Sequence, residues 1–174
     1  STAAMLVFAT TVACGAIGFA DDLMKVWHRR SGGLAGKWRM LLLLVISIVF
    51  ALVAVRVNGF NTTLQLPIVD RAVEVGPIAF TVIVFLIISG FANAVNLTDG
   101  LDGLAAGTSG VVLLTYTGMA FVASQTADNP IFGPRGRDLA IFSASIVGAC
   151  LGFLWFNSFP AGVFMGDTGS YALG

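Results

Sequence analysis

The chain has 174 residues, nine basic and nine acidic side chains, and a formal net charge of zero. This balance excludes the broad basic surface of a nucleic-acid-binding protein, so we predict no nucleic-acid partner. Hydrophobic residues make up 57% of the chain and charged residues only 10%, against roughly 25% charged residues in soluble domains. With a mean hydropathy of +0.92, the composition indicates a protein embedded in a lipid bilayer.

Five runs along the chain are apolar enough to be membrane spans, which need about 20 residues each. The sequence therefore predicts an all-α fold, a polytopic transmembrane helix bundle that forms a single domain over residues 1–174. The fourth run is the least hydrophobic because glycines dilute it, which membrane helices tolerate. The predicted spans are Thr2–Ala20, Met40–Val55, Gly76–Val95, Leu104–Ser124 and Leu139–Phe156.

The connection between the first two spans, DDLMKVWHRRSGGLAGKWR, contains five of the nine basic residues. Short loops rich in Lys and Arg stay on the cytoplasmic side, so this loop predicts the orientation of the bundle. Asp21 and Asp22 can share a Mg²⁺ ion, which favours carboxylate and phosphate oxygens, and Lys25 and Lys37 can hold phosphate. The alternative is a helix end with two solvated acids beside a loop that only sets topology.

The third span is followed by a second polar stretch, NAVNLTDGLDGLA, at residues 93–105. Asn96, Asp99 and Asp102 are spaced so that a continuing helix would carry all three on one face. Gly100 and Gly103 interrupt such a helix and permit the close approach of a ligand. The alternative is a turn in which Asp102 caps the following span.

The third polar stretch is WFNSFPAGVFMGDTGS, at residues 155–170. Asn157 and Asp167 bracket a segment that Pro and Gly interrupt. Such a turn can offer backbone N–H groups to an anion while Asp167 holds a cation, and Phe164 can stack on a planar base. The alternative is a re-entrant turn with Phe164 anchored at the membrane interface.

Alternation of the five spans places all three polar stretches on the cytoplasmic face. Acids close to span ends lie near the costly apolar slab, so we expect those of the three stretches to form a single site. A zinc site is disfavoured because the chain has one His and no Cys outside the spans. Divalent-metal phosphate chemistry with Mg²⁺ is the prediction that remains. The acids concerned are Asp21, Asp22, Asp99, Asp102 and Asp167.

In this order and on this membrane face, the three stretches resemble the cytoplasmic motifs of the polyprenyl-phosphate N-acetylhexosamine-1-phosphate transferases. Within that family they are most similar to the bacterial members of peptidoglycan synthesis. The resemblance implies a ten-span enzyme that transfers phospho-MurNAc-pentapeptide from its UDP carrier to undecaprenyl phosphate, giving lipid I and UMP with Mg²⁺ as cofactor. The matching residues are DDLMK with Gly33, Leu34 and Lys37, then NAVNLTDGLDGLAAG, then FLWFNSFPAGVFMGDTGS.

The resemblance also implies a role for each polar residue of the three stretches. The catalytic and metal-binding groups would be Asp21, Asp22 and Asp167; Asp21 and Asp22 would handle the metal and the lipid phosphate, with Asp21 a candidate base. Because the lipid phosphate is largely ionised near pH 7, we favour positioning over deprotonation as the role of Asp21. Phosphate would be bound by Lys25 and Lys37. The nucleoside and diphosphate site would be lined by Asn96, Asp99, Asp102, Asn157 and Phe164.

The implied location is the bacterial cytoplasmic (inner) membrane, with the site on the cytoplasmic face. The implied partners are UDP-MurNAc-pentapeptide, undecaprenyl phosphate, the lipid bilayer and a second copy in a homodimer. We expect the chain to be an excerpt of the ten-span fold, inactive by itself.

Two alternatives stay open at this point. A sister transferase that uses UDP-GlcNAc or another UDP-hexosamine would share the metal site. A membrane transporter, which is a different class of protein, would carry its charged residues near the bilayer midplane. Here the acids collect at span ends, which favours the transferase.

Overall fold

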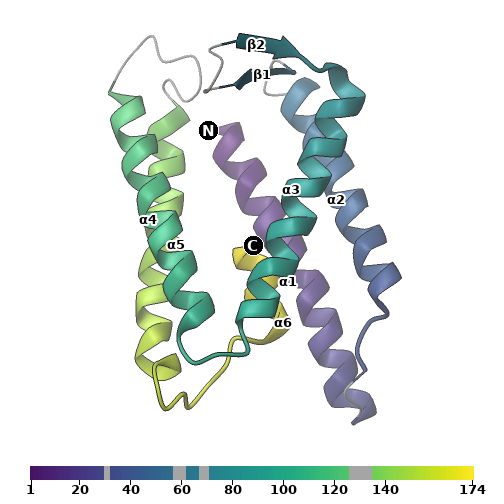
Figure 1. The fold of residues 1–174 in the computed structure, drawn as a ribbon, viewed down its shortest axis with the longest axis vertical. Helices are drawn as coiled ribbons and strands as arrows, with labels where there is room; N and C mark the ends of the chain where they lie inside the picture. The colour runs from purple at the N-terminus through teal and green to yellow at the C-terminus, as the bar shows by residue number, and fades with distance from the viewer. Residues whose placement is uncertain (30–31, 57–61, 67–70, 126–134) are drawn as a thin grey trace.

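A computed structural model describes residues 1–29, 32–56, 62–66, 71–125 and 135–174. Five helices in these segments are long and apolar enough to cross a membrane, by length and composition. The prediction of a polytopic helical membrane fold with five spans is therefore confirmed. Figure 1 shows the elements in chain order: α1 (Thr2–His28), α2 (Gly36–Arg56), β1 (Thr63–Leu66), β2 (Arg71–Glu74), α3 (Gly76–Thr98), α4 (Leu104–Ser124), α5 (Gly136–Asn157) and α6 (Gly166–Leu173).

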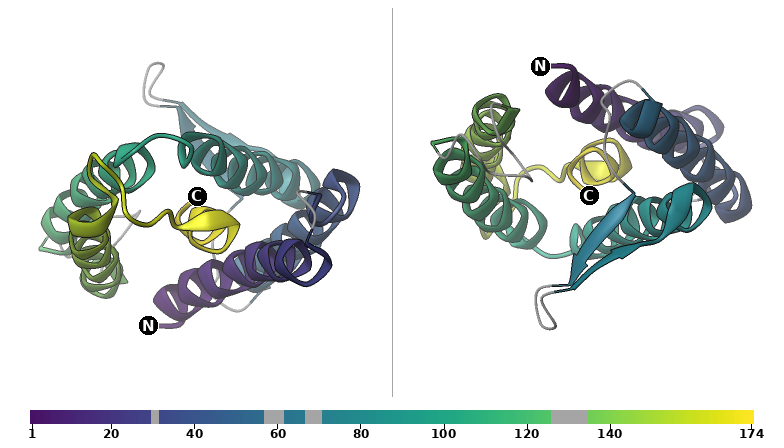
Figure 2. Two further views of the ribbon diagram at one scale, coloured as in Figure 1. Left: turned by 90° about the horizontal axis from the view of Figure 1, so that it is seen from below. Right: turned by 90° about the horizontal axis from the view of Figure 1, so that it is seen from above.

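The long helices form two groups with the short helix α6 between them. Helix α4 packs along α5, α2 packs on both α1 and α3, and α6 packs on α1 and α3. Seen along the bundle, α6 lies in the middle of the ring of longer helices (Figure 2). Strands β1 and β2 pair antiparallel, with Thr63 opposite Glu74, and cover the end of the bundle away from α6 (Figure 1).

A small buried core joins four of the helices. Tyr171 of α6 belongs to this core, and its hydroxyl donates a hydrogen bond to Asn93 Oδ1 of α3 at 3.1 Å. Because an unpaired buried hydroxyl is costly, this bond fixes how α6 docks on α3. The buried members of the core are Cys14, Ile17, Leu43, Ala92 and Tyr171.

The outward faces of the helices are apolar and exposed. Phe19 of α1, Leu86 of α3 and Leu151 of α5 each leave more than half of their side chain uncovered by protein. In a bilayer such side chains contact lipid tails, which are as apolar as leucine. The helix faces are therefore suited to a membrane, and the packed core can stay small.

Several helices extend beyond the predicted spans. Helix α1 continues past Ala20 to His28, because Lys25 pairs with Asp21 and Asp22 at helical spacing and such pairs stabilise helices. Helix α2 begins at Gly36, ahead of the predicted Met40. Helix α4 has the predicted bounds.

Two elements were not predicted from the sequence. The β1–β2 hairpin lies between the second and third predicted spans, and its strands have four residues each. Helix α6 begins at Gly166, inside the segment that was expected to be a turn. Both elements are too short for hydrophobic periodicity to reveal them.

Candidate functional site

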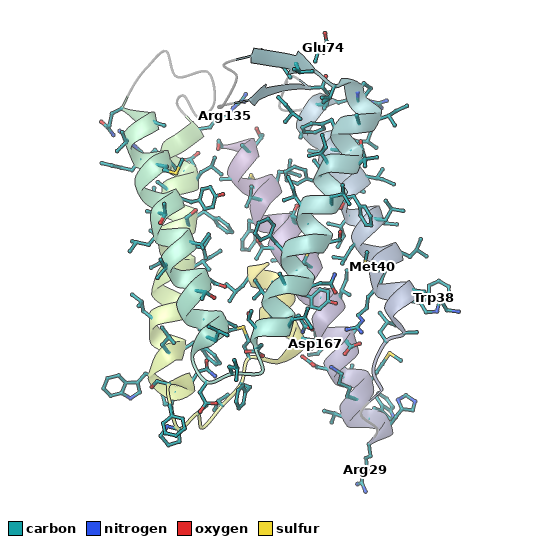
Figure 3. All side chains as sticks on the ribbon, viewed as in Figure 1. Arg29, Trp38, Met40, Glu74, Arg135 and Asp167 are labelled. Carbon is teal, nitrogen blue, oxygen red and sulfur yellow. The ribbon has the colours of Figure 1, made fainter. Side chains whose placement is uncertain are left out.

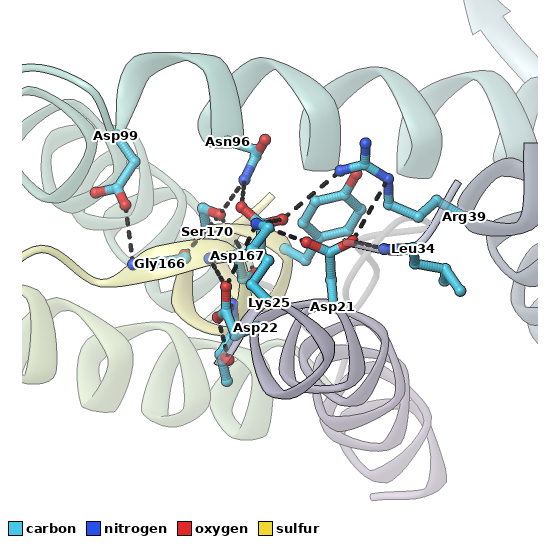
Figure 4. Close-up of polar contacts among 12 residues, drawn as sticks. Asp21, Asp22, Lys25, Leu34, Arg39, Asn96, Asp99, Gly166, Asp167 and Ser170 are labelled. Carbon is cyan, nitrogen blue, oxygen red and sulfur yellow. Dashed lines mark hydrogen bonds and ion pairs between the residues drawn. The ribbon is translucent and has the colours of Figure 1, made fainter. Parts of the chain in front are cut away.

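The three polar stretches meet at the end of the bundle opposite the β-hairpin. Figure 3 shows Asp167 towards the end marked by Arg29, whereas Glu74 and Arg135 mark the hairpin end. The acids come from the last turns of α1 and the first turn of α6, and the C-terminal part of α3 lies beside them (Figure 4). The structure thus brings together residues that are up to 146 positions apart.

The ammonium group of Lys25 lies among three carboxylates. Its Nζ is 2.6 Å from Asp21 Oδ2, 2.8 Å from Asp167 Oδ2 and 3.6 Å from Asp22 Oδ1. One oxygen from each carboxylate lies within 4.8 Å of the others, a spacing that can hold a metal ion. The predicted gathering of Asp21, Asp22 and Asp167 is therefore present, while their roles remain predictions.

Asp21 is the most deeply buried acid of the site, with 1% of its side chain exposed. The backbone N–H of Leu34 donates to its Oδ1 at 2.6 Å. A Cβ atom at Gly33 would lie 2.5 Å from the carboxylate, so only glycine lets the chain come this close. Oδ2 has no hydrogen-bond partner, because Lys25 approaches it as an ion pair without hydrogen-bond alignment.

Asp167 is held from three sides. Asn96 Nδ2 donates to its Oδ1 at 2.6 Å and to Ser170 Oγ at 2.9 Å, and Arg39 Nη1 lies 3.6 Å from Oδ2. Burial raises the pKa of Asp167, but hydrogen bonds from Lys25 and Asn96, together with the charge of Lys25, outweigh it and lower the pKa. The carboxylate form that a hard cation needs is thereby favoured.

Asp22 and Asp99 both bind the first turn of α6. Asp99 Oδ2 accepts a hydrogen bond from Gly166 N at 3.0 Å, and Asp22 Oδ2 accepts one from Thr168 N at 2.9 Å. Burial and the charges of Asp167 and Asp22 raise the pKa of Asp99, although hydrogen bonds from the backbone of Gly166 and Met165 oppose this. These acids stand where a helix N-terminus favours negative charge.

The prediction that Asn96, Asp99 and Asp102 share one helical face is wrong. Helix α3 ends at Thr98, and Gly103 adopts a φ of 71°, which turns the chain before α4. Asn96 is therefore helical, whereas the two acids lie in the connecting turn.

The alternative, in which Asp102 caps α4, is also wrong. The N-cap of α4 is Gly103, without a side-chain cap bond. Exposed Asp102 instead accepts a hydrogen bond from Ala161 N through Oδ2 at 3.0 Å. It therefore anchors the segment that leads from α5 to α6.

Asn157 is buried and binds the backbone on both sides. It accepts a hydrogen bond from Gly103 N at 3.1 Å and donates one to the carbonyl of Val163 at 2.8 Å. Phe164 is 47% exposed, and Lys37 lies exposed near the start of α2. The substrate-binding roles predicted for Asn157, Phe164 and Lys37 stay predictions.

Sequence reasoning missed Arg39, Thr168 and Ser170. The side chain of Arg39 approaches Asp21 as well as Asp167, with Nε 4.0 Å from Asp21 Oδ1, and supplies the second cation of the site. Arg39 had been assigned only to the basic loop, two residues from Lys37. The hydroxyls of Thr168 and Ser170 had no sequence signal beyond their place next to Asp167.

A bundle of five apolar helices with a carboxylate cluster at one end defines a multi-pass membrane protein whose clustered acids have a spacing that can hold a metal ion. The family model described as glycosyl transferase family 4 matches residues 4–174, and the chain belongs to this family.

Three curated relatives that align with nearly the whole chain share one name. The chain is 43% identical to the phospho-N-acetylmuramoyl-pentapeptide-transferase of Corynebacterium diphtheriae, over 98% of the chain and 52% of that protein. It is 42% identical to the enzyme of the same name from Rubrobacter xylanophilus, over 97% of the chain and 49% of that protein. It is 44% identical to one from Listeria monocytogenes, over 100% of the chain and 50% of that protein. The chain thus spans about half the length of the curated relatives it matches.

Proposed function

We propose that this chain forms the metal and phosphate site of a transferase that moves phospho-MurNAc-pentapeptide from UDP to undecaprenyl phosphate. An oxygen of the lipid phosphate attacks the sugar-proximal phosphorus, and the bond from this phosphorus to the UMP oxygen breaks. The products are lipid I and UMP. The observation that carries the proposal is the cluster of Asp21, Asp22 and Asp167 around Lys25, in a chain whose relatives bear the name of this enzyme.

The residues of the cluster fit Mg²⁺. The ion prefers carboxylate oxygens together with substrate phosphates, and the cluster offers one oxygen from each of three acids within 4.8 Å of one another. Asp21 and Asp167 would hold Mg²⁺, and Asp22 adds its charge. When bound, Mg²⁺ neutralises phosphate charge and orients the diphosphate.

Lys25 and Arg39 would hold the phosphate oxygens of the two substrates. The reaction brings several negative charges together, so positioning and neutralisation by cations lower its barrier. Both cations already lie within 4.0 Å of the carboxylates. Because the lipid phosphate is ionised near pH 7, we assign Asp21 to positioning. We expect exposed Lys37 to bind phosphate outside the cluster.

The nucleoside end of the substrate would lie beside the turn between α3 and α4. Asn96 contacts Asp167 directly, and Asp99 contacts the neighbouring Gly166. Asp102 lies exposed three residues after Asp99 in the same connection. Phe164 offers a half-exposed ring for a planar base. Asn157 would shape this region by holding the segment that carries Phe164.

We propose that the site faces the cytoplasm in the bacterial inner membrane. The basic residues around α1 and α2 support this orientation through the positive-inside tendency of short loops. A cytoplasmic site lets a soluble UDP-sugar meet a lipid phosphate that stays in the membrane. A homodimer remains a prediction from the sequence resemblance.

The deciding experiment measures products in membranes that contain the full-length protein. UDP-MurNAc-pentapeptide and undecaprenyl phosphate should give lipid I and UMP only when Mg²⁺ is present, and chelation should stop turnover. Product formation from UDP-GlcNAc in place of the muramoyl substrate would assign the chain to a sister transferase. No lipid-linked product from either substrate would refute the proposal.

A further inference from the structure

Helix α6 begins with three backbone N–H groups that bind acids from other helices and turns. The first turn of a helix has no internal partners for these groups, and the N-cap residue Met165 supplies no side-chain bond. Gly166 N donates to Asp99 Oδ2 at 3.0 Å, Asp167 N to Asp22 Oδ1 at 3.3 Å, and Thr168 N to Asp22 Oδ2 at 2.9 Å. Two acids therefore cap α6 from outside.

Asp22 binds this turn with both oxygens. Besides the two backbone groups, the Thr168 hydroxyl donates to Asp22 Oδ2 at 2.7 Å. Gly166 has a φ of 66°, and a Cβ atom there would lie 3.0 Å from Asp22 Oδ2. Glycine at this position both allows the turn and leaves room for the carboxylate.

The backbones of α1 and α6 touch one turn before Asp22. A Cβ atom at Gly18 would lie 2.1 Å from the carbonyl oxygen of Asp167 and 2.7 Å from Thr168 N. Residues four apart lie on the same face of a helix, so Gly18 and Asp22 present one surface to α6. Gly18 sets how closely the two helices approach, and Asp22 holds the N-terminal turn of α6.

The three acids of the cluster differ in what their oxygens contact. Asp21 Oδ2 pairs with Lys25 Nζ at 2.6 Å without an aligned hydrogen bond, and Asp167 Oδ2 is approached by the cations of Lys25 and Arg39. Both oxygens of Asp22 instead accept hydrogen bonds from α6, and Lys25 Nζ is 3.6 Å away. A carboxylate oxygen that accepts such bonds is less available to a metal than one that faces only cations.

We propose that Asp22 is a positioning residue: with Thr168 it holds the first turn of α6 and thereby aims the Asp167 carboxylate. Asp21 and Asp167 are then the acids that reach the metal. The inference rests on the proposed function only where it concerns turnover. The effect of Asp22 on metal affinity can be measured without substrate.

The test measures Mn²⁺ affinity by electron paramagnetic resonance in the full-length protein, since Mn²⁺ and Mg²⁺ both suit carboxylate ligands. Thr168→Val removes the hydroxyl and keeps the shape, and it should weaken binding about 10-fold, as loss of a group that orients a ligand typically does. Thr168→Ser keeps the hydroxyl and should bind as wild type. Asp22→Asn should also cost about 10-fold, and combining it with Thr168→Val should add little, because both remove one anchor.

Thr117→Val is the matched control, because its hydroxyl donates to the Leu113 carbonyl within α4; it should leave Mn²⁺ affinity unchanged. Unaltered affinity in Thr168→Val, or fully additive losses in the double variant, would overturn the inference. So would a loss in Asp22→Asn as complete as that in Asp167→Asn, which would make Asp22 a ligand. Thermal unfolding identifies variants that do not fold. If Asp22→Asn does not fold, the Mn²⁺ affinities of Thr168→Val and Thr168→Ser decide the inference. Wild-type protein that binds Mn²⁺ but makes no lipid-linked product would refute the proposed function alone.

Discussion

At the scale of single residues, Asp167 is the group to which both cations of the site and one amide are directed. Lys25 and Arg39 approach one of its oxygens and Asn96 the other. The neighbouring acids, in contrast, each have a backbone partner that holds them. Substitutions at these positions should therefore separate metal binding, phosphate binding and loop anchoring.

Asp167→Asn should abolish turnover and Mg²⁺-dependent binding of the UDP-sugar. The substitution keeps the shape of the side chain and removes the charge that a hard cation needs. We expect the melting temperature to stay close to wild type, because Asn can still accept the bond from Asn96. Asp138→Asn, near the hairpin end of α5, is the charge-matched control. Near-normal turnover in Asp167→Asn would falsify the metal assignment.

Arg39→Met should lower kcat/KM for the UDP-sugar by about 10-fold or more, because hydrogen bonds to charged groups contribute about 1.5–3 kcal/mol. Arg39→Lys keeps the charge and should retain much of the activity. Arg56→Met, at the far end of α2, removes an exposed cation away from the site and should act as wild type. If Arg39→Met equals Arg56→Met in steady-state kinetics, Arg39 has no part in binding the substrate.

Asp102→Asn separates substrate binding from loop anchoring. Asn keeps an oxygen that can accept the bond from Ala161 N, so the anchor should survive. If Asp102 binds the nucleoside end, affinity for the UDP-sugar should fall by about 1–3 kcal/mol while the dependence on undecaprenyl phosphate stays unchanged. Kinetics with each substrate varied in turn give both values. Wild-type affinity in Asp102→Asn, with a loss only in Asp102→Ala, would leave Asp102 an anchor.

At the scale of the elements, the contact of α1 with α6 sets the geometry of the site. The docking brings acids from the two helices to within 4.8 Å of one another. It depends on Gly15 and Gly18, because a Cβ atom at Gly15 would already lie 3.2 Å from that of Ala172. Small residues that let backbones approach are the usual means of close packing between membrane helices.

Gly18→Ala should push α6 away from α1. The added Cβ atom would meet the Asp167 carbonyl oxygen at 2.1 Å, and overpacking of this kind costs about 1–3 kcal/mol. We expect a lower melting temperature and a loss of Mn²⁺ affinity. Gly152→Ala on α5, where nothing lies within 4 Å of the new atom, is the matched control and should be neutral. Unchanged stability and affinity in Gly18→Ala would show that the helices are not in contact there.

At the scale of the whole molecule, the bundle has two different ends. The carboxylate site with Lys25 and Arg39 lies at one end, and the β-hairpin lies at the other (Figure 1). The apolar faces between them give five candidate spans. A bilayer would therefore separate the site from the hairpin.

Impermeant thiol labelling in intact cells tests this separation. Gly100→Cys, in the exposed turn between α3 and α4, should be protected from an external maleimide, because we place that end in the cytoplasm. Glu74→Cys, at the exposed end of β2, should react. Opening the cells should make Gly100→Cys react as well. Labelling of Gly100→Cys from outside would reverse the proposed orientation.

The five spans could be predicted because hydropathy is a local property. A span of about 20 residues is recognised from its own composition, and α4 has the bounds that this reasoning predicts. The gathering of acids also followed from local facts, since alternating spans bring every second connection to the same face. The sequence by itself therefore determined the class of fold and the end of the bundle that holds the polar site.

Only the tertiary structure decided what each polar group contacts. Lys37 and Arg39 are two residues apart on one helix and so point about 160° away from each other, to nearly opposite sides. Packing of α2 through buried Leu43 decides that Arg39, and not Lys37, reaches the acids. The division of labour among Asp21, Asp22 and Asp167 likewise depends on the docking of α6 against α1. These contacts join residues far apart in the chain, so their geometry comes from the packing of whole helices and is absent from any local pattern.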